Sequence, residues 1–152
     1  MRLDFRRANI EDIPIAIKLQ NEAFYQDFLR YGSCPSYNRP ESDMRDIITN
    51  HHDFLILADD IPVGNMIIKL REGNECHLNS LSILPEYQGK GIGKAAMAFI
   101  ETAFPDSVLF TLDTPADKQS NVAFYVSCGY SIVGHVEFDE MKLVLLERRR
   151  IG

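Results

Sequence analysis

The sequence lacks the features that mark several protein classes. No apolar run approaches the roughly 18 residues of a transmembrane helix, and the N-terminus carries no apolar signal core. The three cysteines are odd in number, widely spaced and without metal-ligand spacing, which argues against a disulfide framework and a metal site. No repeat, low-complexity tract or linker interrupts the chain. These absences predict a cytoplasmic protein with neither a metal nor a membrane partner.

Positive charge is also scarce. The chain has 16 Lys and Arg against 22 Asp and Glu, a formal net charge of −6. A nucleic-acid partner would require a basic face, so none is expected. The tripeptide Arg148-Arg149-Arg150 is too short to supply one, and we expect it to be a solvated tail. At 152 residues the chain suits a single domain over residues 1–152.

The chain does contain a glycine-rich stretch between a strand and a helix, Leu81–Lys94. Its glycines stand at alternate positions: Gly89, Gly91 and Gly93. The apolar residues that follow lie on one helical face: Ile92, Ala95, Ala96, Phe99, Ile100 and Ala103. Glycines let the backbone turn and expose N–H groups at the positive end of the helix dipole, where a phosphate is stabilised. With the charges of Lys90 and Lys94, the stretch predicts a phosphate or pyrophosphate site.

Other readings of this stretch stay open. A tight connection needs no ligand at all. A Walker-type loop needs Ser or Thr after Gly-Lys, where this chain has Ala95. The run Gly91-x-Gly93-x-x-Ala96 fits a relaxed dinucleotide fingerprint, with Asp113 near the expected distance. However, a polar segment separates the strand from the glycines, and too little chain follows for a doubly wound sheet. A dinucleotide-binding oxidoreductase is therefore the lesser alternative.

Periodicity predicts about seven strands and four helices in mixed order. Strands are expected at 3–7, 54–58, 62–70, 75–84, 107–113, 131–138 and 141–147. Helices are expected from Asn9 to about residue 30, at 42–50, after the glycines, and at about 118–128. Asn9 and Asp12 form a weak capping box for the first helix. This order predicts an α+β (mixed α/β) fold, a mainly antiparallel sheet with helices on both faces.

The glycine stretch resembles motif A of the GNAT superfamily of acyl-CoA N-acyltransferases. Residues 88–93 read Gln-Gly-Lys-Gly-Ile-Gly, which matches the family's Gln/Arg-x-x-Gly-x-Gly/Ala, and Leu81-x-Ile83-x-Pro85 is similar to its preceding strand. A second segment, Asn121–Tyr130, is similar to motif B, with one residue fewer between Asn and Phe-Tyr than the common form. The two motifs stand in the expected order, and the resemblance covers nearly the whole chain.

The resemblance implies one N-acetyltransferase domain whose sheet splays open beside the glycine loop. It implies acetyl-CoA as co-substrate, with its pantetheine arm in the split and no metal. The residues expected to contact it are Leu81, Ser82, Ile83, Gln88, Gly89, Lys90, Gly91, Ile92, Gly93, Lys94, Asn121 and Phe124. A non-catalytic acyl-CoA-binding module is the alternative function.

Transfer of an acetyl group to a primary amine, by direct attack in a ternary complex, requires management of two protons. Tyr125 is the expected general acid. A phenol of pKa about 10 protonates a thiolate whose acid is near 8.5 only if it is well placed or its pKa is lowered. Its alternative role is that of a core aromatic. Glu75 matches a strand position where GNAT enzymes often place a Glu that acts through water as base. His77, on the same strand face, is the alternative, and many family members need no base.

The acceptor pocket is expected around the first helix and the loop after it. Its candidate residues are Glu22, Tyr25 and Tyr31, with Asp27 and Tyr37 beside them. Acidic and aromatic groups suit a cationic amine through charge pairing and cation–π contact, although a solvated helix face would have the same composition. The expected partners are a small-molecule or peptide amine, and a homodimer is allowed.

Overall fold

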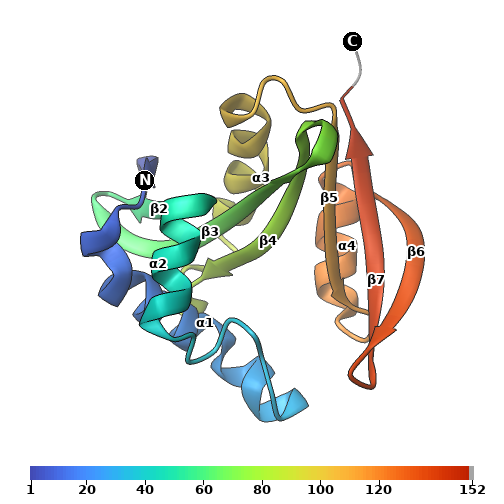
Figure 1. Cartoon of the computed structure of the whole chain (residues 1–152), viewed down its shortest axis with the longest axis horizontal. Coiled ribbons are helices and arrows are strands. Elements are labelled where there is room, and N and C mark those ends of the chain that lie inside the picture. The colour runs from blue at the N-terminus through green and yellow to red at the C-terminus, as the bar shows by residue number, and fades with distance from the viewer. Residues whose placement is uncertain (151–152) are drawn as a thin grey trace. The chain divides into compact units, whose positions relative to one another are not determined.

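The computed structural model describes residues 1–150 (Figure 1). Two compact units divide the chain. The first holds residues 1–69 and 79–100, and the second holds residues 70–78 and the chain from Glu101 onward. The boundary passes through three elements, two consecutive strands and the long helix after the glycines.

The strands belong to one sheet in the order β1-β2-β3-β4-β5-β7-β6. Their bounds are β1 (Leu3–Arg7), β2 (His52–Ala58), β3 (Ile61–Arg71), β4 (Glu75–Ile83), β5 (Leu109–Pro115), β6 (Ser131–Phe138) and β7 (Met141–Arg149). Neighbours pair antiparallel in β1–β2, β2–β3, β5–β7 and β6–β7. The pair β4–β5 is parallel, at Cys76 with Phe110 and His77 with Thr111. The predicted open, mostly antiparallel sheet is confirmed.

Four α-helices accompany these strands in residues 1–150: α1 (Ile13–Tyr31), α2 (Glu41–Asn50), α3 (Ile92–Ala103) and α4 (Gln119–Ser127). The predicted capping box is present, since the Asn9 side chain accepts from a backbone N–H and Asp12 accepts from the Asn9 N–H. It caps a short 3-10 turn, so α1 itself begins four residues later than the capping residue. No helix among these residues is both long and apolar enough to cross a membrane.

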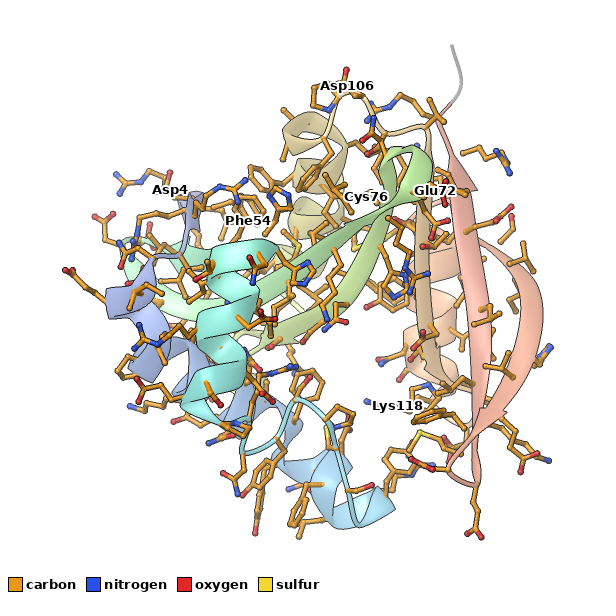
Figure 2. All side chains as sticks on the ribbon, in the orientation of Figure 1. Asp4, Phe54, Glu72, Cys76, Asp106 and Lys118 are labelled. Carbon is orange, nitrogen blue, oxygen red and sulfur yellow. The ribbon has the colours of Figure 1, made fainter. Side chains whose placement is uncertain are left out.

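Helices cover both faces of the sheet in the first unit. Leu55 of β2 is fully buried in a cluster with apolar residues of α1 and α2. Its neighbour Phe54, labelled in Figure 2, points to the other face, where Phe99 of α3 meets it with ring centroids 5.1 Å apart. Phe5 of β1 stacks on the same Phe99 ring at 4.5 Å. Because successive side chains of a strand point to opposite faces, one sheet can pack against helices on each side.

A close approach of β3 to the end of β4 requires a glycine in the first unit. A Cβ added to Gly64 would lie closer to the Ser82 carbonyl oxygen than side-chain carbons ever approach, and Ile56 would crowd it as well. The Leu84 N–H donates to the Val63 carbonyl at 2.9 Å, directly beside this contact. Gly64 thereby lets β4 run tightly along β3 up to the point where the glycine-rich loop begins.

In the second unit the C-terminal segment differs from the prediction. We expected Arg148-Arg149-Arg150 to be a solvated tail, but β7 continues through Arg149. Arg148 donates to the Cys128 carbonyl at 2.7 Å and pairs with Glu101 at 3.2 Å. Arg150 donates to the carbonyls of Glu101, Phe104 and Ser107 at 2.8, 3.1 and 3.0 Å. Two of the three arginines are therefore structural: Arg148 binds a carbonyl at the end of α4, and Arg150 binds carbonyls in the last turn of α3 and just after it.

Candidate functional site

The glycine-rich loop connects β4 to α3 in the first unit. After β4 comes a 3-10 turn at Pro85–Tyr87, and α3 begins at Ile92. Between them Gly89 and Gly91 have φ angles of 75° and 85°, in the left-handed region that favours glycine. A Cβ on either residue would meet nothing within 4 Å. The glycines therefore serve the backbone conformation, and the space over the loop is open.

The Gln88 side chain fixes the shape of this loop. Its Nε2 donates to the carbonyl of Ile83, the last residue of β4, at 3.0 Å. In α3 the Ala95 N–H reaches the Gly91 carbonyl at 3.1 Å, whereas the amides of residues 92–94 have no preceding helical carbonyl to bind. These amides lie at the positive end of a 12-residue helix, beside the exposed Lys90 and Lys94. The loop has the geometry of an anion site.

The strand leading into the loop presents its three predicted residues to two different faces. Leu81 and Ile83 are half-buried, while Ser82 between them is 1% exposed. The Ser82 Oγ has no hydrogen-bond partner within residues 1–150, and its carbonyl faces Gly64. Any ligand that runs along this end of β4 would therefore meet backbone groups and the side chains of Leu81 and Ile83, not the serine hydroxyl.

The second unit carries the remaining predicted residues of motif B, on α4. Asn121 donates from Nδ2 to Thr114 Oγ1 of β5 at 3.5 Å. Tyr125 is half-buried among aromatic rings, 5.1 Å from Phe124 and 6.2 Å from Tyr130 between centroids. Burial raises the pKa of Tyr125 well above its ordinary value, and the negative charge of a Cys128 thiolate would raise it further. The phenol therefore stays protonated at neutral pH. A lowered pKa, one of the two conditions considered for a general acid, is not found.

Glu75, the predicted base, lies in a hydrogen-bonded set at the start of β4. Its Oε2 accepts from Thr111 Oγ1 at 2.9 Å and from Arg71 at 3.2 Å. The His77 Nδ1 lies 2.9 Å from the same Thr111 Oγ1. A hydroxyl has one proton, and Thr111 gives it to a carboxylate that can only accept, so Nδ1–H of His77 is assigned as a donor to Thr111. In the neutral ring, Nε2 then carries the lone pair.

Thr111 was missed at the level of sequence. No local pattern marks it, because a threonine on a strand is ordinary. It joins Glu75 and His77 only through the parallel register of β4 and β5, in which His77 pairs with Thr111.

A cavity of about 450 Å³ in the first unit brings together several predicted acceptor residues. It is lined by Asn21, Glu22, Tyr25, Tyr37, Pro85 and Glu86. The Tyr37 ring stacks on Phe28 at 4.5 Å and lies 6.0 Å from the Tyr25 ring. Asp27 and Tyr31 do not line the cavity, and the Tyr31 ring instead faces the Arg30 guanidinium, 5.4 Å from the ring centroid. Three of the predicted residues thus line the same cavity: Glu22, Tyr25 and Tyr37.

Pro85 and Glu86 were not predicted as pocket residues. They belong to the 3-10 turn between β4 and the glycine loop, so the cavity reaches the segment that leads into that loop. The polar run after the strand was visible in the sequence, but nothing local indicates that α1 packs beside it.

Solved structures share this fold. The PaiA N-acetyltransferase of Thermoplasma acidophilum, determined in complex with coenzyme A, matches with a TM-score of 0.83 at 17% identity, over 99% of this chain and 100% of that one. The ribosomal-protein-S18-alanine N-acetyltransferase of Escherichia coli matches with a TM-score of 0.76 at 14% identity, over 99% and 97% of the two chains. At these identities the likeness concerns the fold alone.

Comparison of the sequence with a relative and with a family model identifies the family as well as the fold. The uncharacterized protein YrkN of Bacillus subtilis (strain 168) is 38% identical over 132 residues, which cover 83% of this chain and 71% of that protein. The model of the acetyltransferase (GNAT) family matches residues 18–130, a span that includes the whole glycine loop and Tyr125. The resemblance seen in the two motifs is therefore confirmed, and the chain belongs to the GNAT family of acetyltransferases.

Proposed function

We propose that this protein is an N-acetyltransferase that moves an acetyl group from acetyl-CoA to a primary amine by direct attack in a ternary complex. The observation that carries the proposal is the glycine loop of motif A, with φ angles of 75° at Gly89 and 85° at Gly91 and open space above them. The proposal assigns both compact units to one acetyltransferase domain.

The loop suits the pyrophosphate of coenzyme A. Amides from Gly89 to Lys94 supply neutral donors at a helix N-terminus, and Lys90 and Lys94 supply positive charge. The backbone of Leu81–Ile83 would hold the pantetheine arm, and its N–H groups would stabilise negative charge on the thioester oxygen. Asn121 and Phe124 of α4 are assigned to the same cofactor. Gln88 supports the site indirectly, because its side chain is engaged with Ile83.

In the reaction, the neutral amine nitrogen forms a bond to the thioester carbon and the carbon–sulfur bond breaks. The amine nitrogen loses a proton and the departing thiolate gains one. Full transfer from a phenol whose pKa is raised by burial to a thiolate is uphill. We therefore assign Tyr125 the donation of a hydrogen bond to the sulfur as its charge develops, with solvent as the final source of the proton.

Glu75 is assigned the role of base for the amine proton. Its carboxylate accepts from Thr111 and Arg71, so a proton would reach it through water or along the hydrogen bonds from His77 and Thr111. His77 is the alternative base, because its assigned tautomer leaves a lone pair on Nε2.

The 450 Å³ cavity is assigned to the acceptor. Glu22 and Glu86 contribute two carboxylates, and Tyr25 and Tyr37 contribute two phenol rings. This composition suits an amine that carries positive charge along its length, because carboxylates pair with ammonium groups and aromatic faces attract them. Tyr31, predicted for the same pocket, has no part in this assignment.

The test is turnover of a panel of amines by the purified protein. Acetyl-CoA is mixed with spermidine, a monoamine, and peptides with free α-amino or lysine groups, and thiol release is followed spectroscopically. We expect release with at least one amine and preference for those with a second positive charge. Binding of coenzyme A without turnover of any amine would favour the acyl-CoA-binding module. A thermal shift with NAD but not with coenzyme A would favour the oxidoreductase and overturn the proposal.

A further inference from the structure

A buried chain of polar side chains crosses the first unit beneath α1. Gln20 and Asn65 are 0% exposed and Asp53 is 1% exposed. Gln20 Nε2 donates to Asn65 Oδ1 at 2.8 Å, and Asn65 Nδ2 donates to Asp53 Oδ1 at 2.5 Å. The three residues come from α1, β3 and β2, so hydrogen bonds link elements far apart in the sequence.

The chain continues into the loop that follows α1. Arg39 Nε donates to Gln20 Oε1 at 3.2 Å, and its guanidinium also donates to Ser36 Oγ at 3.2 Å. Ser36 in turn lies 3.5 Å from the hydroxyl of Ser80 on β4, and both serines are buried. Within loop residues 32–40, the half-buried Arg39 therefore binds Gln20 of α1, and Ser36 connects the same arginine to Ser80 of β4.

The chemistry of the groups fixes the direction of every link. Asn65 Nδ2 faces the Phe54 carbonyl, which only accepts, as well as Oδ1 of Asp53, so Asn65 Oδ1 must be the acceptor for Gln20. The Gln20 amide then presents its oxygen to Arg39, which only donates. The chain thus runs from the buried carboxyl group of Asp53 to the guanidinium of Arg39 with each amide held in one orientation, a cooperative arrangement.

Asp53 depends on this chain. Its Oδ2 has no hydrogen-bond partner within residues 1–150. Burial raises the pKa of its carboxyl to about 7 and the charge of Asp12 acts in the same direction, while the Asn65 hydrogen bond and the charge of Arg39 lower it. Arg39 is the cation that acts on Asp53, so the loop and the buried carboxylate stabilise each other.

The same loop forms a wall of the cavity. The Asn38 N–H donates to Asn21 Oδ1 at 2.7 Å, and the Tyr37 N–H donates to the Cys34 carbonyl at 3.0 Å. Both Asn21 and Tyr37 line the cavity. Tyr37 lies between Ser36 and Arg39, the two residues by which the loop is attached to the buried chain.

We propose that Arg39 is a positioning residue for the amine acceptor: by binding Gln20 and Ser36 it holds Tyr37 against α1 and so forms the pocket wall. The inference rests on the proposed function of that pocket. Arg39 touches no reacting atom. Removal of the Arg39 side chain releases the loop. Binding of the amine must then also order the loop, which weakens the affinity for the amine.

The test compares Arg39→Met with Arg45→Met. Both remove one positive charge and keep the aliphatic stem, but Arg45 is an exposed residue of α2 that pairs only with Glu41 among residues 1–150. For Arg39→Met we expect the KM of the best amine in the panel to rise about tenfold, while kcat and the KM of acetyl-CoA change less than about twofold. Arg45→Met should leave all three unchanged.

Hydrogen exchange gives a readout that does not depend on turnover. In Arg39→Met, exchange should accelerate at least about tenfold over residues 32–40 and stay unchanged over α3 and β7. Arg39→Lys keeps the charge but loses the planar fork, so its exchange rate over residues 32–40 should lie between those of the unchanged protein and Arg39→Met. This variant remains informative if Arg39→Met folds poorly. Faster exchange with an unchanged amine KM, or equal exchange in both variants, would overturn the proposal. If the unchanged protein releases no thiol with any amine, the proposed function fails on its own, and exchange still decides whether Arg39 holds the loop.

Discussion

Asn65 and Asp53 share a 2.5 Å hydrogen bond between β3 and β2, and both side chains are fully buried. The bond reaches only one carboxylate oxygen, since Oδ2 has no partner within residues 1–150. Removing a charge from water is costly unless its polar atoms are all paired. The fold therefore favours the protonated form of Asp53, which has a measurable consequence for stability.

The first prediction concerns pH. The pKa of Asp53 is about 7 in the folded protein and about 4 in an unfolded chain, so between these values the folded state binds more protons. The free energy of unfolding should fall as pH rises from about 4 to about 7, by at most about 1.4 kcal/mol per pH unit, and should level off above that. Denaturant unfolding at several pH values measures the slope.

Asp53→Asn should flatten this slope, because the amide keeps an acceptor for Asn65 and carries no charge. The exposed Asp106, labelled in Figure 2, offers the control, and Asp106→Asn should retain the slope of the unchanged protein. An equal slope in all three proteins would mean that Asp53 does not titrate in this window.

The second prediction separates cofactor binding from backbone strain. Gly91→Ala forces an L-residue to a φ angle of 85°, and Gly73→Ala does the same at 73° in a surface turn. Each should cost roughly 1–2 kcal/mol of stability. Only Gly91→Ala should weaken the binding of coenzyme A, by tenfold or more in calorimetric titration, because the proposed pyrophosphate site lies in that loop and not in the turn at Gly73. Equal affinities in the two variants would contradict the anion site at motif A.

A third prediction uses the arginines at the end of β7. Arg150 donates to three carbonyls around the last turn of α3 and lies 5.2 Å from the Phe110 ring centroid, whereas Arg149 is exposed. Arg150→Ala should lower the free energy of unfolding by about 1–3 kcal/mol, since partly buried carbonyls lose a charged donor. Arg149→Ala should lie within about 0.5 kcal/mol of the unchanged protein. Thermal unfolding compares the two, and equal losses would return Arg150 to the role of a solvated tail.

The sequence predicted the features that depend on nearby residues. The capping box of Asn9 and Asp12, the turn at Gly89 and Gly91, and the face that α3 buries each follow from local chemistry within a few positions. Element bounds were less accurate, and β5 lies two residues later than expected, at Leu109–Pro115. The hydrophobic pattern predicts that a strand is present and buried more accurately than it predicts the residues at which the strand begins and ends.

What sequence reasoning missed depends on register between distant segments. Gln20 is a polar residue on a helix and nothing near it in the sequence marks it as buried, yet it is fully buried because Asn65 of β3 lies opposite it. Thr111 and Arg150 gain their partners in the same way, from strands paired far along the chain. The pairing of distant strands cannot be predicted from neighbouring residues in a single sequence.

The last prediction concerns Tyr125. Because burial raises its pKa well above the ordinary value, the phenol is protonated throughout the neutral and mildly alkaline range. Tyr125→Phe should lower kcat by roughly 10²-fold, the contribution typical of a positioned proton or hydrogen-bond donor, while coenzyme A affinity in calorimetric titration stays within about threefold. Tyr130→Phe is the matched control, since burial also raises the pKa of Tyr130 and its ring lies 6.2 Å away. It should retain kcat.

In the unchanged protein, kcat should show no decline from Tyr125 below about pH 10, because deprotonation of its phenol begins only near or above that value. An alkaline limb below pH 9 that disappears in Tyr125→Phe would mean that the bound cofactor reverses the effect of burial, and unchanged turnover in Tyr125→Phe would remove the residue from the mechanism.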